Sequence, residues 1–223
     1  MKAVGSRGPA YRVETERLVL RCWSPTDAAR VRQVLDQSDA YLRPFIPFMA
    51  SEPRSLPDTV TWLRRHRACF DRDQHYRYAI FDPTEATLMG ETMLLDRADD
   101  GQREVGYWLA PEHAGHGYAT EAAAAMTRLA FELDGVDRVE IQCAPENARS
   151  VEVARRLDYL HEATLARRIT DTDGEVRDLM IWVMFRTRYP GSTPNALAMR
   201  AFDCLGAPLP LGPTGSADSA RKL

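Results

Sequence analysis

The segment HAGHGYATEA, residues 113–122, brings together residue types that can hold an anion. Gly115 and Gly117 carry no side chain, so a bulky group can approach their backbone N–H groups closely. The sequence after them has the period of a helix, which Gly135 ends. The apolar face of this helix consists of Ala119, Ala122, Ala123, Met126, Leu129, Ala130 and Leu133. Unpaired N–H groups at the positive end of such a helix predict a binding site for a phosphate or diphosphate.

Neither of the two common glycine-loop motifs matches this segment. A Walker A loop requires a lysine directly after its last glycine, and no lysine follows Gly117. A Rossmann fingerprint belongs at the start of a βαβ unit, whereas two predicted helices and several strands come first in this chain. The glycine pair alone leaves two interpretations open: an anion site, or a turn that only lets the helix pack closely.

Other chemistry is less well supported by the residues. His113 and His116, at i and i+3, could form part of a metal site, but no further ligand cluster accompanies them, so we expect no bound metal. The GxSxG elbow of an α/β-type serine hydrolase is absent from the sequence. The cysteines form no CxxC pair, and we expect core residues or free thiols rather than disulfides or a zinc knuckle. They are Cys22, Cys69, Cys143 and Cys204.

The elements that must position the glycine loop are predicted from the periodicity around it. Alternating apolar residues indicate strands ahead of the loop. These strands are at residues 18–22, 76–82, 87–96 and 103–111. The turn residues RADDG, at 97–101, join the last two into an antiparallel meander. Pro111 cannot donate a hydrogen bond to a neighbouring strand, so we expect pairing to fail there and a gap to open in the sheet.

Two helices are predicted between the first and second of these strands. Ser24, Pro25 and Asp27 suit the cap and first turn of one helix, and residues 58–70 form the other. The intervening loop is rich in proline and unusually apolar. Its apolar residues are Tyr41, Phe45, Phe48 and Met49. The loop is either pinned to the core or forms an aromatic lip over a substrate groove, and both interpretations stay open.

The chain beyond the glycine loop continues to alternate strands and helices. A strand at 138–143 precedes Asn147, which caps a helix that runs to about Leu157. Two further strands, at 160–170 and 175–187, flank the hairpin sequence DTDG. The second of these strands is apolar on both faces, so we expect other elements to cover it.

The C-terminal part of the chain changes in composition. From residue 189 prolines and glycines are too frequent for a continued sheet. One short helix is expected, over residues 195–205. The segment is either mobile or docked on a groove or a neighbouring subunit, and the sequence leaves this open.

Three stretches, in this order, make the sequence resemble a known family. They are TERLVLRCWSPTDA, EVGYWLAPEHAGHGYATEA and PENARSVEVARRLDY. They are similar to the GNAT N-acetyltransferases, and within these to the RimJ/RimL-like branch that acetylates protein N-termini and related amines. The resemblance implies an α+β GNAT fold, with a mixed, mostly antiparallel sheet of about six to seven strands, helices on both faces and a splayed central strand pair. It implies an N-terminal arm at 1–12, an acetyltransferase domain at 13–188 and a C-terminal extension at 189–223.

The resemblance also implies that acetyl-CoA is the cosubstrate. Backbone N–H groups from Ala114 to Ala119 would hold its diphosphate, and the pantetheine arm would enter the gap beside Leu109 and Ala110. Asn147 matches a family asparagine near the pantetheine, and Ser150 matches a position that lies close to the acetyl sulfur in Rim-type enzymes. The expected cofactor-binding residues are Trp108, Leu109, Ala110, Ala114, Gly115, His116, Gly117, Tyr118, Ala119, Thr120, Asn147 and Ser150.

Three positions depart from the family pattern. Ala114 stands where an arginine or another polar residue is common, so one charged partner of the phosphates is missing. His113 and His116 compensate if they are protonated, which predicts tighter cofactor binding at pH 6 than at pH 8. Ala154 replaces the tyrosine acid of many members. Asp158 replaces a glycine at a turn where aspartate tolerates the left-handed conformation.

The chemistry of such an enzyme needs a neutral amine, a stabilised oxyanion and a proton for the departing thiolate. Alignment of the two reactants supplies roughly 7–11 kcal/mol, so single acid–base groups contribute modestly. Glu104 is the first candidate for the base, ahead of Glu91 and Glu140, and an exposed or salt-bridged strand residue is the structural alternative. Ser150 is the candidate for bonding the leaving sulfur, and its structural alternative is a cap or first-turn residue of a helix.

The predicted function is transfer of an acetyl group from acetyl-CoA to a primary amine, by direct attack in a ternary complex. The alternative is a non-catalytic CoA-binding sensor or recruitment module of the same fold. The acceptor stays open between a protein N-terminal amine and a small-molecule amine.

Composition and charge bear on the remaining partners. A net charge of -3 and a pI near 6.0 give no basic surface for nucleic acid or anionic membrane, and we expect neither partner. The first 18 residues lack the apolar core of a signal peptide, and no apolar run approaches the roughly 20 residues of a membrane helix. We therefore expect a cytoplasmic protein, with a homodimer as one option for its assembly.

Overall fold

A nine-stranded sheet forms the centre of the computed structural model, which describes residues 8–96 and 101–212. The strand order is β7-β8-β6-β5-β4-β3-β2-β1-β9, and every neighbouring pair is antiparallel except β5 and β6. The strands are β1 (Arg12–Glu14), β2 (Val19–Cys22), β3 (Tyr76–Phe81), β4 (Leu88–Asp96), β5 (Gln102–Leu109), β6 (Arg138–Cys143), β7 (Leu160–Thr170), β8 (Val176–Phe185) and β9 (Arg200–Phe202).

The sheet has two strands more than the six to seven expected. These are the three-residue strands β1 and β9, which are too short for a periodicity signal. The predicted meander of β4 and β5 is confirmed by their antiparallel register. Most of the RADDG turn, residues 97–100, lies outside the described residues.

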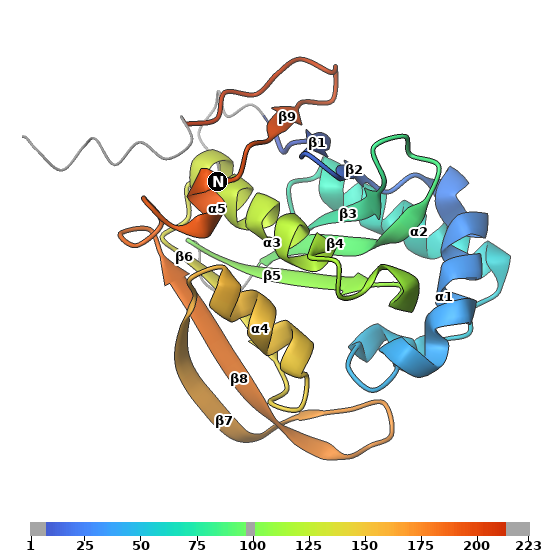
Figure 1. Cartoon of the computed structure of the whole chain (residues 1–223). Helices are drawn as coiled ribbons and strands as arrows, with labels where there is room; N and C mark the ends of the chain where they lie inside the picture. The colour runs from blue at the N-terminus through green and yellow to red at the C-terminus, as the bar shows by residue number, and fades with distance from the viewer. Residues whose placement is uncertain (1–7, 97–100, 213–223) are drawn as a thin grey trace, which may run out of the picture.

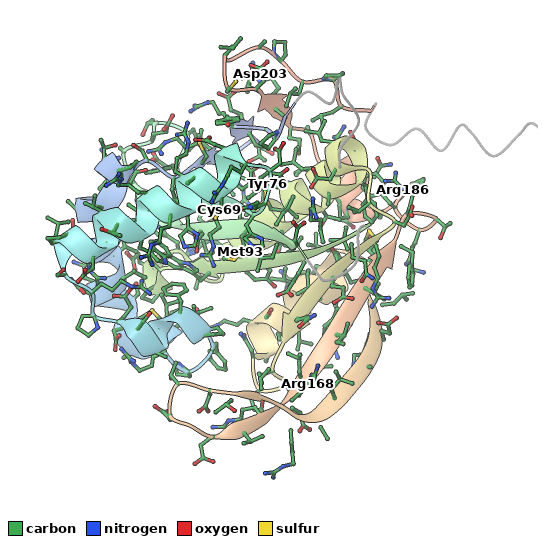
Figure 2. All side chains as sticks on the ribbon, turned by 180° about the vertical axis from the view of Figure 1, so that it is seen from behind. Cys69, Tyr76, Met93, Arg168, Arg186 and Asp203 are labelled. Atoms are coloured by element: carbon green, nitrogen blue, oxygen red, sulfur yellow. The ribbon has the colours of Figure 1, made fainter. Side chains whose placement is uncertain are left out.

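Helices cover both faces of the sheet, as expected. They are α1 (Ala28–Leu42), α2 (Leu56–Asp71), α3 (Tyr118–Leu129), α4 (Ala148–Arg156) and α5 (Thr193–Ala196). In Figure 1, α3 and α4 lie in front of the sheet. Figure 2, seen from behind, shows α1 and α2 on the opposite face.

Side-chain hydrogen bonds fix where several helices begin. The Ser24 and Asp27 side chains form a reciprocal capping box ahead of α1. Ser55 accepts from the Asp58 N–H at the start of α2, three residues earlier in the chain than the predicted start. Asn147 Oδ1 accepts from the Ser150 N–H, so the predicted cap of α4 is confirmed.

Two predicted chain reversals also have the expected backbone. Gly135 ends the α3 segment, through a π-helical turn at Ala130–Asp134, with a φ of +72°. Asp158 follows α4 with a φ of +62°, which confirms that this aspartate adopts the left-handed conformation. Its carboxylate accepts hydrogen bonds from the Thr193 N–H and hydroxyl.

The alternation of side chains along the strands divides the apolar residues into two clusters. One cluster includes Val105 of β5, Ile141 of β6 and the buried face of α3. Alanines at 122–125 in α3 are almost fully buried, and their small side chains let this helix lie close to the sheet. The other cluster packs α1 and α2 on the opposite face, where it includes Trp108. Both faces of β5 are therefore fixed by packing.

The central strands β5 and β6 pair over three residues and then separate. Their parallel register joins Gln102, Arg103 and Glu104 to residues 138–140. Beyond this point β5 stays paired with β4 and β6 stays paired with β8. The predicted gap is confirmed, but its position relative to Pro111 differs from the prediction. The gap opens before Pro111, and the N–H of Ala110 still donates to Met89 O.

The second hairpin, β7–β8, turns at the predicted Asp173-Gly174 sequence, where Gly174 has a φ of +85°. The expectation that β8 is covered on both faces holds for Trp182, Val183 and Met184. The first half of β8, residues 176–181, is exposed or half-buried, because this end of the hairpin extends beyond the helices.

The described part of the C-terminal segment is docked on the sheet. The helix predicted over 195–205 is wrong: α5 ends at Ala196, and β9 instead pairs with the edge of β1. Arg128 of α3, which is 1% exposed, donates to Leu197 O and to Gly212 O. The first of these contacts satisfies a backbone carbonyl that the predicted helix would have bonded internally. Figure 2 shows Asp203, after β9, at the opposite end of the molecule from Arg168 of β7.

Candidate active site

The glycine loop leads into α3 with its backbone amides uncovered. Gly115 and Gly117 both have a φ of +82°, and Gly117 occupies the cap position of α3. The Ala114 N–H donates to Pro111 O, and the next amide with an acceptor is that of Glu121, which donates to Gly117 O. Between them, the six N–H groups of residues 115–120 have no hydrogen-bond acceptor among the described residues. This is the arrangement that an anion site at a helix N-terminus requires.

A cleft of about 600 Å³ lies beside this loop. Its walls come from β5, the glycine loop, the first turn of α3, α4 and the end of α1. The predicted residues that line it are Trp108, Leu109, Ala114, Gly115, Gly117, Tyr118, Ala119, Thr120, Asn147 and Ser150. The fold therefore brings together four segments, at residues 41–46, 107–109, 114–120 and 146–156, at the place where β5 and β6 separate.

Two predicted cofactor residues lie outside this lining. Ala110 is buried and its N–H is used by Met89 O, so it is no donor for a ligand. Because ladder hydrogen bonds alternate along a strand, the N–H of Leu109 points to the other edge of β5, toward the gap. The His116 ring stacks on Tyr118 with a centroid distance of 5.9 Å.

The start of α4 presents a hydroxyl pair to the cleft. Tyr107 OH and Ser150 Oγ lie 2.9 Å apart, and both residues line the cleft. Burial raises the pKa of Tyr107, so its hydroxyl keeps its proton. The sequence reasoning found Ser150 but missed Tyr107. The strand period gave a signal, because Tyr107 must point to the opposite face from Trp108, toward α4.

The runner-up base Glu91 is fully buried and fully engaged. Its carboxylate accepts from Trp23 Nε1 at 2.7 Å, from Trp108 Nε1 at 3.0 Å and from Arg77 Nη1 at 2.9 Å. These bonds tie β4 to the neighbouring strands β3 and β5 and to the chain after β2. They leave the carboxylate no route to an acceptor amine in the cleft.

Glu104 and Glu140 are direct partners in the parallel register, at the last paired position before the gap. Glu140 is buried and accepts from Arg138 Nε at 2.7 Å and from Gln142 Nε2 at 2.8 Å. Glu104 is not among the residues that line the cleft. Both carboxylates therefore lie at the inner end of the gap rather than along its walls.

The apolar loop after α1 combines the two interpretations left open by its sequence. Met49 is fully buried and Phe48 packs against Trp62 and Trp108, so this part is pinned to the core. The preceding residues Tyr41, Leu42, Phe45 and Ile46 line the cleft and form an aromatic lip.

One contact joins the lip to α4 on the opposite wall of the cleft, and a second joins the same segment to the β7–β8 hairpin. Arg149 of α4 donates to Tyr41 OH at 2.8 Å, and its guanidinium lies 5.2 Å from the Tyr41 ring centroid. Thr172, at the tip of the β7–β8 hairpin, donates to Arg43 O at 2.8 Å. The cleft is thus bordered by the lip on one side and by α4 on the other.

His113 lies at the end of a short 3-10 turn, with its Nε2 at 4.0 Å from Glu112 Oε1. Within residues 8–96 and 101–212 no three side chains of the metal-binding types come together. A search of the same residues finds no helix that is long and apolar enough to cross a membrane.

Comparison with protein families gives a match over most of the chain. The model described as "Acetyltransferase (GNAT) domain" matches residues 17–159. This range contains the glycine loop, the separated strands and α4.

Individual proteins extend the match. "Putative ribosomal N-acetyltransferase YdaF" of Bacillus subtilis is 30% identical over 183 residues, which are 79% of this chain and 95% of that protein. "[Ribosomal protein uS5]-alanine N-acetyltransferase" of Escherichia coli is 25% identical over 78% of this chain and 90% of its own length. The solved structure of the RimL ribosomal L7/L12 alpha-N-protein acetyltransferase in complex with coenzyme A has a TM-score of 0.70. It is 19% identical and covers 77% of this chain and 95% of its own.

Proposed function

From the premise that this chain belongs to the GNAT acetyltransferase family, we propose that its acceptor is the α-amino group of a protein N-terminus. The chain is an N-acetyltransferase that uses acetyl-CoA, rather than a non-catalytic module. The acceptor proposal is supported by the relatives, whose names describe acetylation of ribosomal proteins. We place this reaction in the cytoplasm, because ribosomal proteins are made there. We also keep the division into an arm at 1–12, a catalytic domain at 13–188 and an extension at 189–223.

The observation that carries the cofactor site is the row of six uncovered amides beside the gap in the sheet. In the proposed complex, the N–H groups of residues 115–120 hold the diphosphate at the positive end of α3. The pantetheine arm lies along the open edge of β5, where the N–H of Leu109 is directed toward it. Asn147 and Ser150 then face the arm from α4. His116 contributes its backbone N–H and not its ring.

The proposed chemistry is direct attack of the neutral amine on the thioester carbonyl. A C–N bond forms, the C–S bond breaks and the proton lost by the amine balances the charge of the departing thiolate. Glu104 stays our candidate for the base that removes a proton from the ammonium form of the acceptor before the attack, since it lies at the inner end of the gap. The Ser150 hydroxyl donates a hydrogen bond to the leaving sulfur, while Tyr107 donates to Ser150 Oγ and fixes its orientation. Tyr107 thereby compensates for Ala154, which occupies the position of the usual tyrosine acid.

The proposed route of the acceptor runs through the cleft, along the lip that faces α4. Tyr41, Phe45 and Ile46 give this passage an apolar wall, which suits the first side chains of an extended peptide. Arg149 and Glu152 add polar groups at its edge.

Acetylation of defined peptides tests the proposal. The protein is incubated with acetyl-CoA and peptides that match the N-termini of ribosomal proteins uS5 and L7/L12, and the products are mapped by tandem mass spectrometry. We expect one acetyl group, on the α-amine. The matched controls are the same peptides with a formylated N-terminus and an internal lysine, together with spermidine and an aminoglycoside. Acetylation of the small amines or the lysine, with no reaction at free N-termini, would overturn the proposed acceptor.

A further inference from the structure

We propose that Arg17 and Glu121 form a positioning pair that keeps the N-terminus of α3 attractive to the diphosphate of acetyl-CoA. The pair rests on the proposed cofactor site and adds two residues to it, one of them from the turn between β1 and β2. Neither residue lines the cleft, so their effect on the cofactor is indirect.

Glu121 places a carboxylate in the first turn of the helix that is to bind an anion. It is 9% exposed, and an unneutralised negative charge there would oppose a bound diphosphate at short range. The carboxylate is instead surrounded by donors. Thr15 Oγ1 lies 2.6 Å from Oε1, and the Arg17 backbone N lies 3.1 Å from the same oxygen. Arg17 Nε and Nη2 lie 2.7 and 2.6 Å from Oε2.

The same arginine also fixes the glycine loop. Arg17 Nη1 donates to His116 O at 3.0 Å, and the guanidinium lies 4.8 Å from the Tyr118 ring centroid. A Cβ atom at Gly117 would lie 3.4 Å from Arg17 Nη2, so the loop passes directly against this side chain. Because the C=O and the N–H of one trans peptide unit point in opposite directions, this contact directs the N–H of Gly117, which lines the cleft, away from Arg17.

The electrostatic consequence follows from charge balance. Ala114 supplies no charge at the loop, so the attraction for the diphosphate comes from the amides and the helix dipole. Arg17 cancels the carboxylate in the first turn of α3, which would weaken this attraction. The structure therefore assigns to Arg17 the role of a neutralising partner as well as an anchor.

The Arg17→Gln variant tests the pair through the kinetics of two acyl donors. We expect the KM for acetyl-CoA to rise about tenfold, with kcat within about twofold of the parent enzyme. S-acetylpantetheine, which has no diphosphate, serves as the second donor, and its kcat/KM should be unchanged. A loss of packing or folding would lower the use of both donors equally. Arg17→Lys keeps the charge without the two-point contact and should have an intermediate KM.

The second variant isolates the repulsion. In Arg17→Gln combined with Glu121→Gln, the uncancelled carboxylate is gone, and the KM for acetyl-CoA should return to within about threefold of the parent value. Arg200→Gln, which breaks an exposed ion pair between Arg200 of β9 and Glu14 of β1, is the matched control and should leave both donors unaffected. The proposal is overturned if Arg17→Gln alters both donors alike, or if Glu121→Gln gives no rescue. An inactive parent enzyme would instead contradict the proposed function itself.

Discussion

Substitution of Tyr107 by phenylalanine probes the hydroxyl pair at the start of α4. The change removes one oxygen atom and keeps the aromatic ring that spans the gap between β5 and α4. Ser150 Oγ then loses the partner at 2.9 Å that, in the proposed chemistry, directs its proton toward the sulfur. The diphosphate amides of the glycine loop lie elsewhere in the cleft and are not altered.

The size of the effect follows from the energy of a single neutral hydrogen bond. Such a bond contributes about 0.5–1.5 kcal/mol net, and a change of 1.36 kcal/mol in a barrier is tenfold in rate. We therefore expect kcat to fall roughly 2- to 13-fold, with the KM for acetyl-CoA within about twofold of the parent value. Since Tyr107 acts through Ser150, its removal should cost nothing further when Ser150→Ala is already present.

Steady-state release of the CoA thiol, with a saturating peptide acceptor, measures all four members of the cycle. The pKa of Tyr107 is raised by burial, so the alkaline limb of the rate profile should be the same in parent and Tyr107→Phe enzymes. Tyr159→Phe is the matched control, because Tyr159 is also buried and its hydroxyl lies 2.7 Å from Thr127 Oγ1, away from the cleft. Equal kcat in parent and Tyr107→Phe enzymes, or additive losses in the double variant, would refute the assigned role.

Three further predictions concern the glycine loop, acid stability and the docked C-terminal segment. Gly117→Ala places a Cβ on a residue with a φ of +82°, at a cost of about 1–2 kcal/mol, and should weaken CoA binding in calorimetry by tenfold or more. Burial, together with the nearby Arg77 and Arg54, lowers the pKa of His66 to about 3. In the unfolded chain, His66 binds a proton below its ordinary pKa of about 6.5, whereas in the folded protein it stays neutral down to about pH 3. The free energy of unfolding therefore falls as the pH decreases from about 6.5 toward 3. The urea midpoint should therefore drop less between pH 7 and pH 5 in His66→Gln than in the parent. Arg128→Ala removes the buried ion-pair partner of Glu132, leaves the carbonyls of residues 197 and 212 unpaired and should destabilise the protein by about 3–5 kcal/mol in urea.

Each of these predictions has a distinct failure. Unchanged CoA affinity in Gly117→Ala would mean that the loop tolerates a side chain and is not held in the left-handed conformation. An equal acid dependence of His66→Gln and parent would show that other groups dominate the proton uptake. For Arg128→Ala, hydrogen exchange at residues 197–212 should accelerate, and protection equal to that of the parent would contradict the anchoring role.

The regular elements of the central fold are predictable because their signals are local. The caps Ser24 and Asn147 and the reversals at Gly135 and Asp158 depend on residues within a few positions of each other. The strand β9 is not predictable in this way, because its partner is β1, almost 190 residues away. The same holds for the site where the gap opens. Pro111 marks the end of β5, whereas the separation from β6 begins at residue 105 and depends on packing between strands distant in sequence.

The residues of the candidate site also fall into two groups, those with a local sequence signal and those that depend on contacts between distant residues. The glycine loop is a contiguous segment, so its composition predicts its exposed amides. Tyr107 and Arg17 act only through contacts to α4 and α3, at separations of 43 and 104 residues. No local pattern encodes those contacts. For Glu91, the sequence suggested a role that the contacts in the structure do not support. Its residue type and strand position suit a base, but its carboxylate accepts hydrogen bonds from two indoles and an arginine.

The central sheet consists of two parts that are joined only where β5 and β6 pair, over three residues of each strand. We call this short junction the seam. Six strands lie on one side of the seam and three on the other. In the proposed complex, the amide groups of the pantetheine arm enter this opening. They take the place of the backbone hydrogen bonds that β5 and β6 do not make there, much as an inserted strand would. Occupancy of the opening should therefore stiffen the contact between the two parts of the sheet, which are already joined by the apolar cluster that includes Val105 of β5, Ile141 of β6 and α3.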